Sequence, residues 1–121
     1  MTQTITFPEH MRGDWWGGAI ITCTPKPNFD PIDVTTCTEI LAQMKTEKTS
    51  KKFVVEFSKS NGKITTPAAD KIVIAGQVMD IPANIYYADL EITTADGKPL
   101  TIFSIEWEII QDVSRKIVVT P

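Results

Sequence analysis

The chain has 121 residues, of which 42% are hydrophobic and 22% charged, and its formal net charge is −3 at pH 7. These values are typical of one soluble globular domain with its own core, so we assign residues 1–121 to a single domain. They exclude the dense positive charge of a nucleic-acid-binding domain and the run of about 20 apolar residues that a membrane-spanning helix needs. We therefore expect no nucleic acid and no membrane among its partners. The N-terminus lacks the pattern of a signal peptide, which predicts folding in a cytoplasm.

The first two expected strands lie near the N-terminus. Residues 2–7 alternate Thr, Ile and Phe, and we expect this strand to stop at Pro8, because proline lacks the amide hydrogen that a strand donates. Residues 15–24 form the second strand, which Gly17 and Gly18 are expected to bend or weaken. A proline-rich loop follows.

Segment 39–46 fits two structures. Its residue types favour a helix. However, Ile40, Ala42 and Met44 also alternate onto one face, as in a strand. Because strand patterns flank it on both sides, we predict a strand here.

Further strand patterns continue to the C-terminus. Residues 53–57 predict a strand whose odd-numbered side chains point inward. The Asn-Gly turn at 61–62 is expected to pair residues 63–66 back onto it. Residues 71–75 and 116–120 predict two more strands. With turns at such short intervals, the chain predicts an all-β, antiparallel, immunoglobulin-like sandwich of about seven to nine strands.

The strongest pattern is a hairpin between residues 86–92 and 101–109, centred on Asp96-Gly97. A two- or four-residue loop there gives a single register. Three inward cross-strand pairs follow from it: Tyr86 with Trp107, Ala88 with Ile105, and Leu90 with Phe103.

The same register places four carboxylates on the outer face of the hairpin: Asp89, Glu91, Glu106 and Glu108. A one-residue slip would bury them at a cost of several kcal/mol each, which fixes the register. Such a cluster can bind calcium, but calcium needs convergent loop oxygens, so we expect a solvated strand face instead. Lys45, Lys51 or Lys52 would neutralise it if their strands adjoin.

The sequence lacks a recognisable catalytic set. His10 is the only histidine and falls in a polar N-terminal segment, where we expect a solvated turn residue. No serine occupies a nucleophile elbow, and no glycine-rich phosphate loop is present. We therefore predict no enzymatic activity, no cofactor and no metal site.

Cys23 and Cys37 are the only cysteines, and their spacing matches no zinc or redox motif. In a reducing compartment we expect two small buried hydrophobes, while a disulfide between them stays open.

Three aromatic residues are candidates for contacts with other proteins. Trp15 and Trp16 are consecutive, so one of them must face away from the core if the segment is a strand. An outward tryptophan can anchor an interface or be covered by the N-terminal arm. Tyr87 also points outward in the predicted hairpin.

The two ends of the chain, residues 1–8 and 116–121, are candidate interaction arms. Both are apolar and strand-forming, and Phe7, Ile117 and Val119 are their candidate contact residues. Such termini can add a strand to a neighbour's open sheet edge. Alternatively, they complete the chain's own sheets.

Asn84-Ile85-Tyr86, placed directly after a turn, is similar to the corner tyrosine that opens strand F of immunoglobulin-like domains. Ala88 stands where antibody domains carry a cysteine, so the resemblance implies the architecture without the inter-sheet disulfide.

Five segments in order resemble small immunoglobulin-like domains of tailed bacteriophages and prophages, such as the N-terminal domain of baseplate upper proteins. They are Arg12-Gly13-Asp14-Trp15, 30–35, 81–90, Asp96-Gly97 and 111–115. The resemblance implies a virion structural protein in the tail, baseplate or neck or on the capsid. It would be made in the bacterial host cytoplasm, present in several copies or as a homo-oligomer, and bound to other virion proteins. The alternative is a carbohydrate- or receptor-binding module that uses Trp15, Trp16 and Tyr87.

Overall fold

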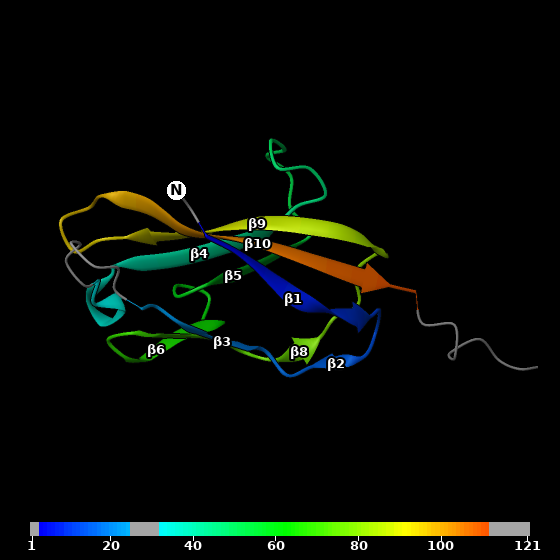
Figure 1. Cartoon of the computed structure of the whole chain (residues 1–121), viewed down its shortest axis with the longest axis horizontal. Coiled ribbons are helices and arrows are strands. Elements are labelled where there is room, and N and C mark those ends of the chain that lie inside the picture. Colours follow the sequence, from blue (N-terminus) through cyan, green and yellow to red (C-terminus); the bar gives the residue numbers. More distant parts are fainter. Residues whose placement is uncertain (1–2, 25–31, 112–121) are drawn as a thin grey trace, which may run out of the picture.

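The computed structural model describes residues 3–24 and 32–111, and this part of the chain is all-β. Figure 1 shows two layers of strands that face each other. The elements are β1 (Gln3–Met11), β2 (Trp15–Trp16), β3 (Ala19–Thr22), the short 3-10 helix η1 (Val34–Thr36), β4 (Glu39–Met44), β5 (Val55–Ser58), β6 (Ile64–Ala68), β7 (Lys71–Ile74), β8 (Gln77–Val78), β9 (Asn84–Thr93) and β10 (Pro99–Ile110).

One layer is a five-stranded sheet in the order β1-β10-β9-β4-β5. The other layer contains the sheet β3-β7-β6 and the two-stranded pair β2-β8 (Figure 1). All neighbours are antiparallel except β1 and β10, which run in the same direction with Gln3 opposite Phe103. The expectation of a purely antiparallel fold is therefore corrected to one mixed sheet, since alternation within a strand carries no information about the direction of its neighbour.

The first strand does not stop at Pro8, as its sequence predicts, but continues to Met11. The register against β10 shifts between Phe7 and His10, so the proline falls in an irregular stretch. Because β1 is an edge strand that pairs, among the described residues, only with β10, the missing amide hydrogen of Pro8 affects this one pairing, at its irregular stretch.

The β9–β10 hairpin has the predicted register in its interior. Tyr86 pairs with Trp107, Ala88 with Ile105 and Leu90 with Phe103, which confirms the prediction. All of these side chains are buried except Phe103, which is partly buried.

The tip of this hairpin differs from the prediction. Thr93 pairs with Pro99, so five residues separate the paired positions in place of two or four. Gly97 has a φ of 85°, and its amide donates to the Thr94 carbonyl at 2.9 Å. The Thr94 amide also donates to the Lys98 carbonyl at 2.9 Å, so residues 95–97 form a three-residue loop that ends in a left-handed glycine. A register shift between Thr101 and Phe103 then restores the predicted pairs.

The segment with two interpretations is a strand. Ile40, Ala42 and Met44 of β4 are completely buried, and β4 pairs with both β5 and β9. The prediction for 39–46 is thus confirmed for Glu39–Met44. The packing of neighbouring strands outweighs the helical propensity of the residues.

The Asn-Gly turn at 61–62 does not form a hairpin, contrary to the prediction. β5 pairs with β4, whereas β6 pairs with β7 in the other sheet. Asn61 Oδ1 accepts hydrogen bonds from the amides of Ser58 and Lys63, so the turn redirects the chain between layers. A turn signal fixes the local bend but not the sheet in which the next strand lies.

Of two smaller expectations, one is wrong and one agrees with the structure. Phe53 precedes β5 and is 44% exposed, so its predicted inward orientation is wrong, although Phe57 is fully buried. β7 covers most of the strand expected at 71–75, and its Ile72 and Ile74 are buried.

Four aromatic side chains hold the two layers together at one end of the core. The ring of Trp16 lies 4.6 Å from Trp107, 5.7 Å from Phe7 and 5.6 Å from Phe57, measured between centroids. They come from β2, β10, β1 and β5, so both layers contribute. Aromatic contacts of this kind add about 0.5–1.5 kcal/mol per pair beyond the area that they bury.

Candidate interaction surfaces

The two consecutive tryptophans face opposite sides of β2, as alternation along a strand requires. Trp15 is 66% exposed and lies opposite Val78, which is also exposed. Trp16 belongs to the aromatic core and is 8% exposed. The sequence makes it a candidate contact residue, and its burial corrects that prediction. The two side chains point to opposite sides of β2, and only one side faces the other layer.

The N-terminal arm is part of the domain's own sheet where the structure describes it. Residues 3–8 lie in β1, paired along β10. Phe7 is 6% exposed and packs against Trp107, which corrects its assignment as a contact residue. Ile117 and Val119, the candidates at the other end, lie outside the described residues.

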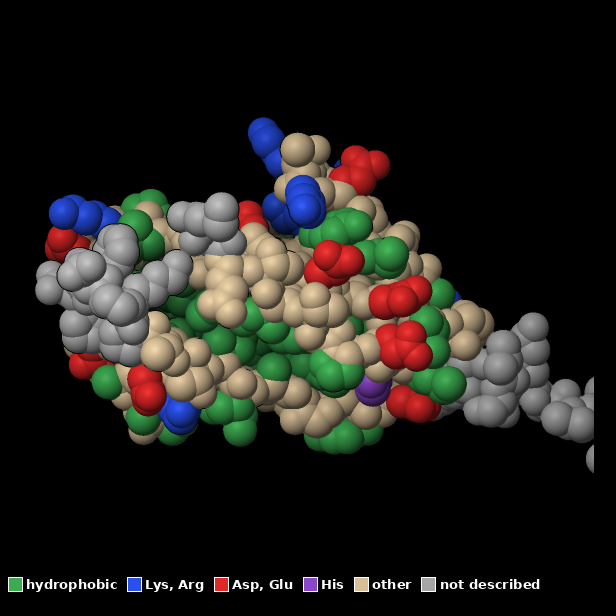
Figure 2. Space-filling model, in the orientation of Figure 1, with side chains coloured by type: hydrophobic (Ala, Val, Ile, Leu, Met, Phe, Trp, Pro, Cys, Tyr) green, Lys and Arg blue, Asp and Glu red, His purple; other side chains and the backbone are tan. Residues whose placement is uncertain are grey.

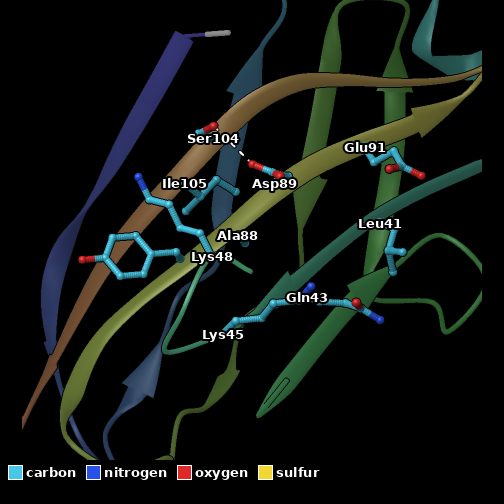
Figure 3. Close-up of a pocket in the computed structure, with 10 residues that line it drawn as sticks. Leu41, Gln43, Lys45, Lys48, Ala88, Asp89, Glu91, Ser104 and Ile105 are labelled. Carbon is cyan, nitrogen blue, oxygen red and sulfur yellow. Dashed lines mark hydrogen bonds between the residues drawn. The ribbon is translucent and has the colours of Figure 1, made fainter. Parts of the chain in front are cut away.

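Tyr87 lies on the outer face of the five-stranded sheet, beside a small polar hollow of about 160 Å³. The hollow is lined by side chains of β4, β9 and β10 and by Lys45 and Lys48 (Figure 3). The Lys48 ammonium lies 5.1 Å from the Tyr87 ring centroid, within the range of a cation–π contact. Two backbone hydrogen bonds, of 2.7 and 2.8 Å, join Tyr87 to Lys45.

The outer carboxylates lie where the register predicts. Asp89 and Glu108 are exposed, and Glu91 and Glu106 are half-buried. Asp89 accepts a hydrogen bond from Ser104 at 3.2 Å (Figure 3).

Two cations reach this face of the sheet. Lys45 lines the same hollow as Asp89, as expected, and it is accompanied by Lys48 in place of Lys51 or Lys52. Within residues 3–24 and 32–111, no three His, Cys, Asp or Glu side chains are grouped as metal ligands would be.

His10 is not in a solvated turn, as its polar surroundings predict. It lies in β1, is half-buried, and its ring centroid is 6.1 Å from that of Trp107. Its Nε2–H donates to the backbone carbonyl of Asp14 at 2.9 Å. The imidazole therefore ties the end of β1 to the turn that leads into β2.

Both cysteines are free thiols. Burial raises the pKa of Cys23 above its ordinary value, and the nearby Asp70 carboxylate adds to this rise. Burial also raises the pKa of Cys37, against the opposing effect of Lys59. Both side chains are thus neutral at pH 7. Cys37 is buried, as expected, whereas Cys23 is only partly buried.

A second, larger concave surface is an apolar groove that the sequence did not reveal. It has a volume of about 1000 Å³ and runs between β1 and β3, which are edge strands of opposite layers. Figure 2 shows hydrophobic side chains gathered in this hollow. They include Ile5, Ile20, Ile21, Leu100, Ile102 and Phe103.

The groove can be predicted only when the order of the strands in the two layers is known. Ile20 and Leu100 each belong to a strand with a plausible apolar pattern, yet Ile20 is 72% exposed and Leu100 is 46% exposed. Only the knowledge that β1 and β3 both lie at sheet edges, on the same flank, would have predicted a shared hollow.

No helix in the described part of the chain has the length and apolar character needed to cross a bilayer. Comparisons with protein-family models, curated proteins and solved structures gave no match for this chain.

Proposed function

We propose that this chain is an immunoglobulin-like structural domain of a tailed-bacteriophage particle. It acts without catalysis, through contacts with other virion proteins and with copies of itself. It is made in the cytoplasm of the bacterial host and resides in the virion, in the tail, baseplate or neck or on the capsid.

The observation that carries the immunoglobulin-like assignment is the strand order. Such domains pack a sheet with strands B, E and D on a sheet with G, F and C, to which the variable type adds C′. Here β3-β7-β6 corresponds to B, E and D, and β10-β9-β4-β5 corresponds to G, F, C and C′. β1 lies beside β10 as an additional edge strand.

The corner tyrosine supports the same assignment. In immunoglobulin-like domains a tyrosine near the start of strand F donates a hydrogen bond to the backbone a few residues upstream. Tyr86 lies near the start of β9, and its hydroxyl donates to the Pro82 carbonyl at 2.5 Å. Ala88, in the place of the antibody cysteine, is buried and needs no disulfide partner.

The surface supports a role in protein–protein assembly. Trp15 and Val78 form an exposed apolar pair on one layer, and the groove between β1 and β3 exposes a second apolar area. Apolar surfaces of this kind are typical of contact sites, and tryptophan is enriched among residues that dominate binding energy. The phage setting itself derives from the ordered sequence resemblance between residues 13 and 115.

Cosedimentation with phage particles tests this function. We expect purified chain to bind particles of the phage or prophage that encodes it, and Trp15→Glu to weaken this binding. Glu108→Gln, on the outer face of the other layer, is the matched control. Absence of binding by the unaltered chain would contradict the proposal.

A carbohydrate-binding role is the second candidate, favoured by the Tyr87 ring beside a polar hollow that Gln43 and Asp89 also line. Aromatic rings with adjacent hydrogen-bonding groups suit sugar rings. A glycan array should then give binding that Tyr87→Ala or Trp15→Ala abolishes. Trp16 is unsuitable for this test because it is buried. An array without any binding removes this candidate.

A further inference from the structure

We infer that the groove between β1 and β3 receives the segment Lys116–Thr120 of a second copy of this chain, which adds a strand to the free edge of β3. The inference deepens the proposed assembly function and rests on it for its biological setting. Its physical argument depends only on the groove, on the two edges and on the composition of the segment.

Each wall of the groove ends in a strand edge with which no described residue pairs. β1 is the last strand of the five-stranded sheet, and β3 is the last strand of the other layer. Among the described residues, none pairs with the outer edge of either strand. Unpaired edge groups are a template for an added strand.

The described lining of the groove lacks the charged side chains that normally stop an exposed strand edge from pairing with another chain. Soluble proteins protect edges with charged side chains, especially lysine. The described residues that line this groove are all uncharged, and β3 itself reads Ala-Ile-Ile-Thr. Ile20, Leu100 and Ile32 leave 72%, 46% and 41% of their surface exposed there. This composition is typical of a surface that another strand covers.

β3 is the better of the two edges for a new partner. β1 contains Pro8 and a register shift within its length, so its ladder of donors is interrupted. β3 has four consecutive residues without proline, Ala19–Thr22, in regular antiparallel register with β7. The groove therefore offers one short, regular edge above an apolar floor.

The segment from Lys116 to Thr120 matches this edge in length and composition. It contains Ile117, Val118 and Val119, which are β-branched residues with high strand preference. Five residues extend over about 17 Å, enough to cover β3. Ile117 and Val119 would point together into the groove, and Val118 would point away.

A segment from another copy can cover the groove more fully than a tightly reversed tail of the same chain. β10 ends at Ile110, seven residues beyond Phe103, which lines the groove. At about 3.3 Å per residue, the two positions are about 23 Å apart along the strand. A tail that reverses its direction over about four residues would place Ile117 and Val119 beside Glu9 and Phe7. It would thus reach only the far end of the groove, leaving the part near Leu100 and Ile102 uncovered. The same segment of a neighbouring molecule has no such restriction.

Size-exclusion chromatography with light scattering on the full chain tests the inference. We expect a mass of two or more copies for the unaltered chain and a monomer for Ile117→Lys/Val119→Lys. Val118→Lys, which alters the opposite side of the same segment, is the matched control and should remain oligomeric. A monomeric unaltered chain, or a double variant that stays oligomeric, overturns the inference.

A peptide experiment locates the site on the groove side. The full-length Ile117→Lys/Val119→Lys chain should bind a synthetic peptide of residues 113–121, with NMR shift changes concentrated at residues 3–8, 19–24 and 100–103. A peptide with lysine at positions 117 and 119 should bind at least tenfold more weakly. Shift changes elsewhere, or equal binding of both peptides, overturn the inference.

Particle binding separates this inference from the proposed function. If the monomeric double variant binds phage particles as tightly as the unaltered chain, binding of the segment in the groove is not what assembles the particle. The inference is then overturned in that role, while the proposed function stands. If the unaltered chain is oligomeric through its tail but does not bind particles, the inference is supported and the virion function falls.

Discussion

The indole Nε1–H of Trp107 donates a 3.0 Å hydrogen bond to the backbone carbonyl of Pro8. This bond connects the fully buried Trp107 of β10 to the irregular part of β1, where the register shifts. It satisfies the polar atom of a buried tryptophan and holds the edge strand that forms one wall of the groove.

Replacing Trp107 with alanine should lower the free energy of unfolding by about 3–5 kcal/mol, because it leaves a large cavity among Phe7, Trp16 and the facing layer. Urea denaturation followed by circular dichroism measures this loss. Glu108→Ala, the exposed neighbour in the same strand, should change stability by no more than about 0.5 kcal/mol. Equal effects of the two substitutions would contradict the described core.

Tyr86→Phe should cost about 1 kcal/mol, since it removes the hydrogen bond to Pro82 but keeps the buried ring. The adjacent Tyr87→Phe, on the outer face, serves as the control and should change stability by less than about 0.5 kcal/mol. Thermal and urea unfolding of both variants test the corner assignment. A Tyr86→Phe protein as stable as the unaltered chain would show that this bond does not help to hold the corner.

Gly18→Ala should destabilise the fold by at least about 1–3 kcal/mol. Gly18 has a φ of 84°, and an added Cβ would lie 2.1 Å from the Ile74 carbonyl oxygen. Gly17→Ala is a matched control at the next position, because a Cβ there meets no atom within 4 Å. If both substitutions are equally tolerated, the close approach of β3 to the β7–β8 connection is wrong.

The two thiols should make stability depend on pH in the alkaline range. Burial raises the pKa of both Cys23 and Cys37 above 9.0, so the folded state favours the protonated form. Their contribution is fully present below about pH 9 and is lost as the pH rises through the raised values. Urea midpoints between pH 7 and 10 should fall more steeply for the unaltered chain than for Cys23→Ser/Cys37→Ser. Parallel pH profiles would contradict this assignment.

The sequence predicted the elements whose patterns are local and strict. The β9–β10 register followed from the cost of burying Asp89 and Glu106, and the structure has that register. β4 followed from the alternation of Ile40 and Met44. For the hairpin, a one-residue shift would have placed charges in the core, so a single register remained. For β4 the residue types also allowed a helix, and the strand patterns on both sides decided between the two.

The errors concern relations between distant segments. The parallel pairing of β1 with β10, the crossing of the chain at Asn61 and the burial of Phe7 and Trp16 depend on which strands become neighbours. Alternation says that one of Trp15 and Trp16 faces outward but not which one. The groove was missed for the same reason, because its two walls come from separate sheets.

Quantitative mass spectrometry of purified particles tests the central claim most directly. The proposed function predicts that particles purified from cells that encode this chain contain it in several copies, in a constant ratio to the major structural proteins through gradient purification. If the chain is absent from particles while present in the host lysate, its assignment as a virion structural protein is wrong.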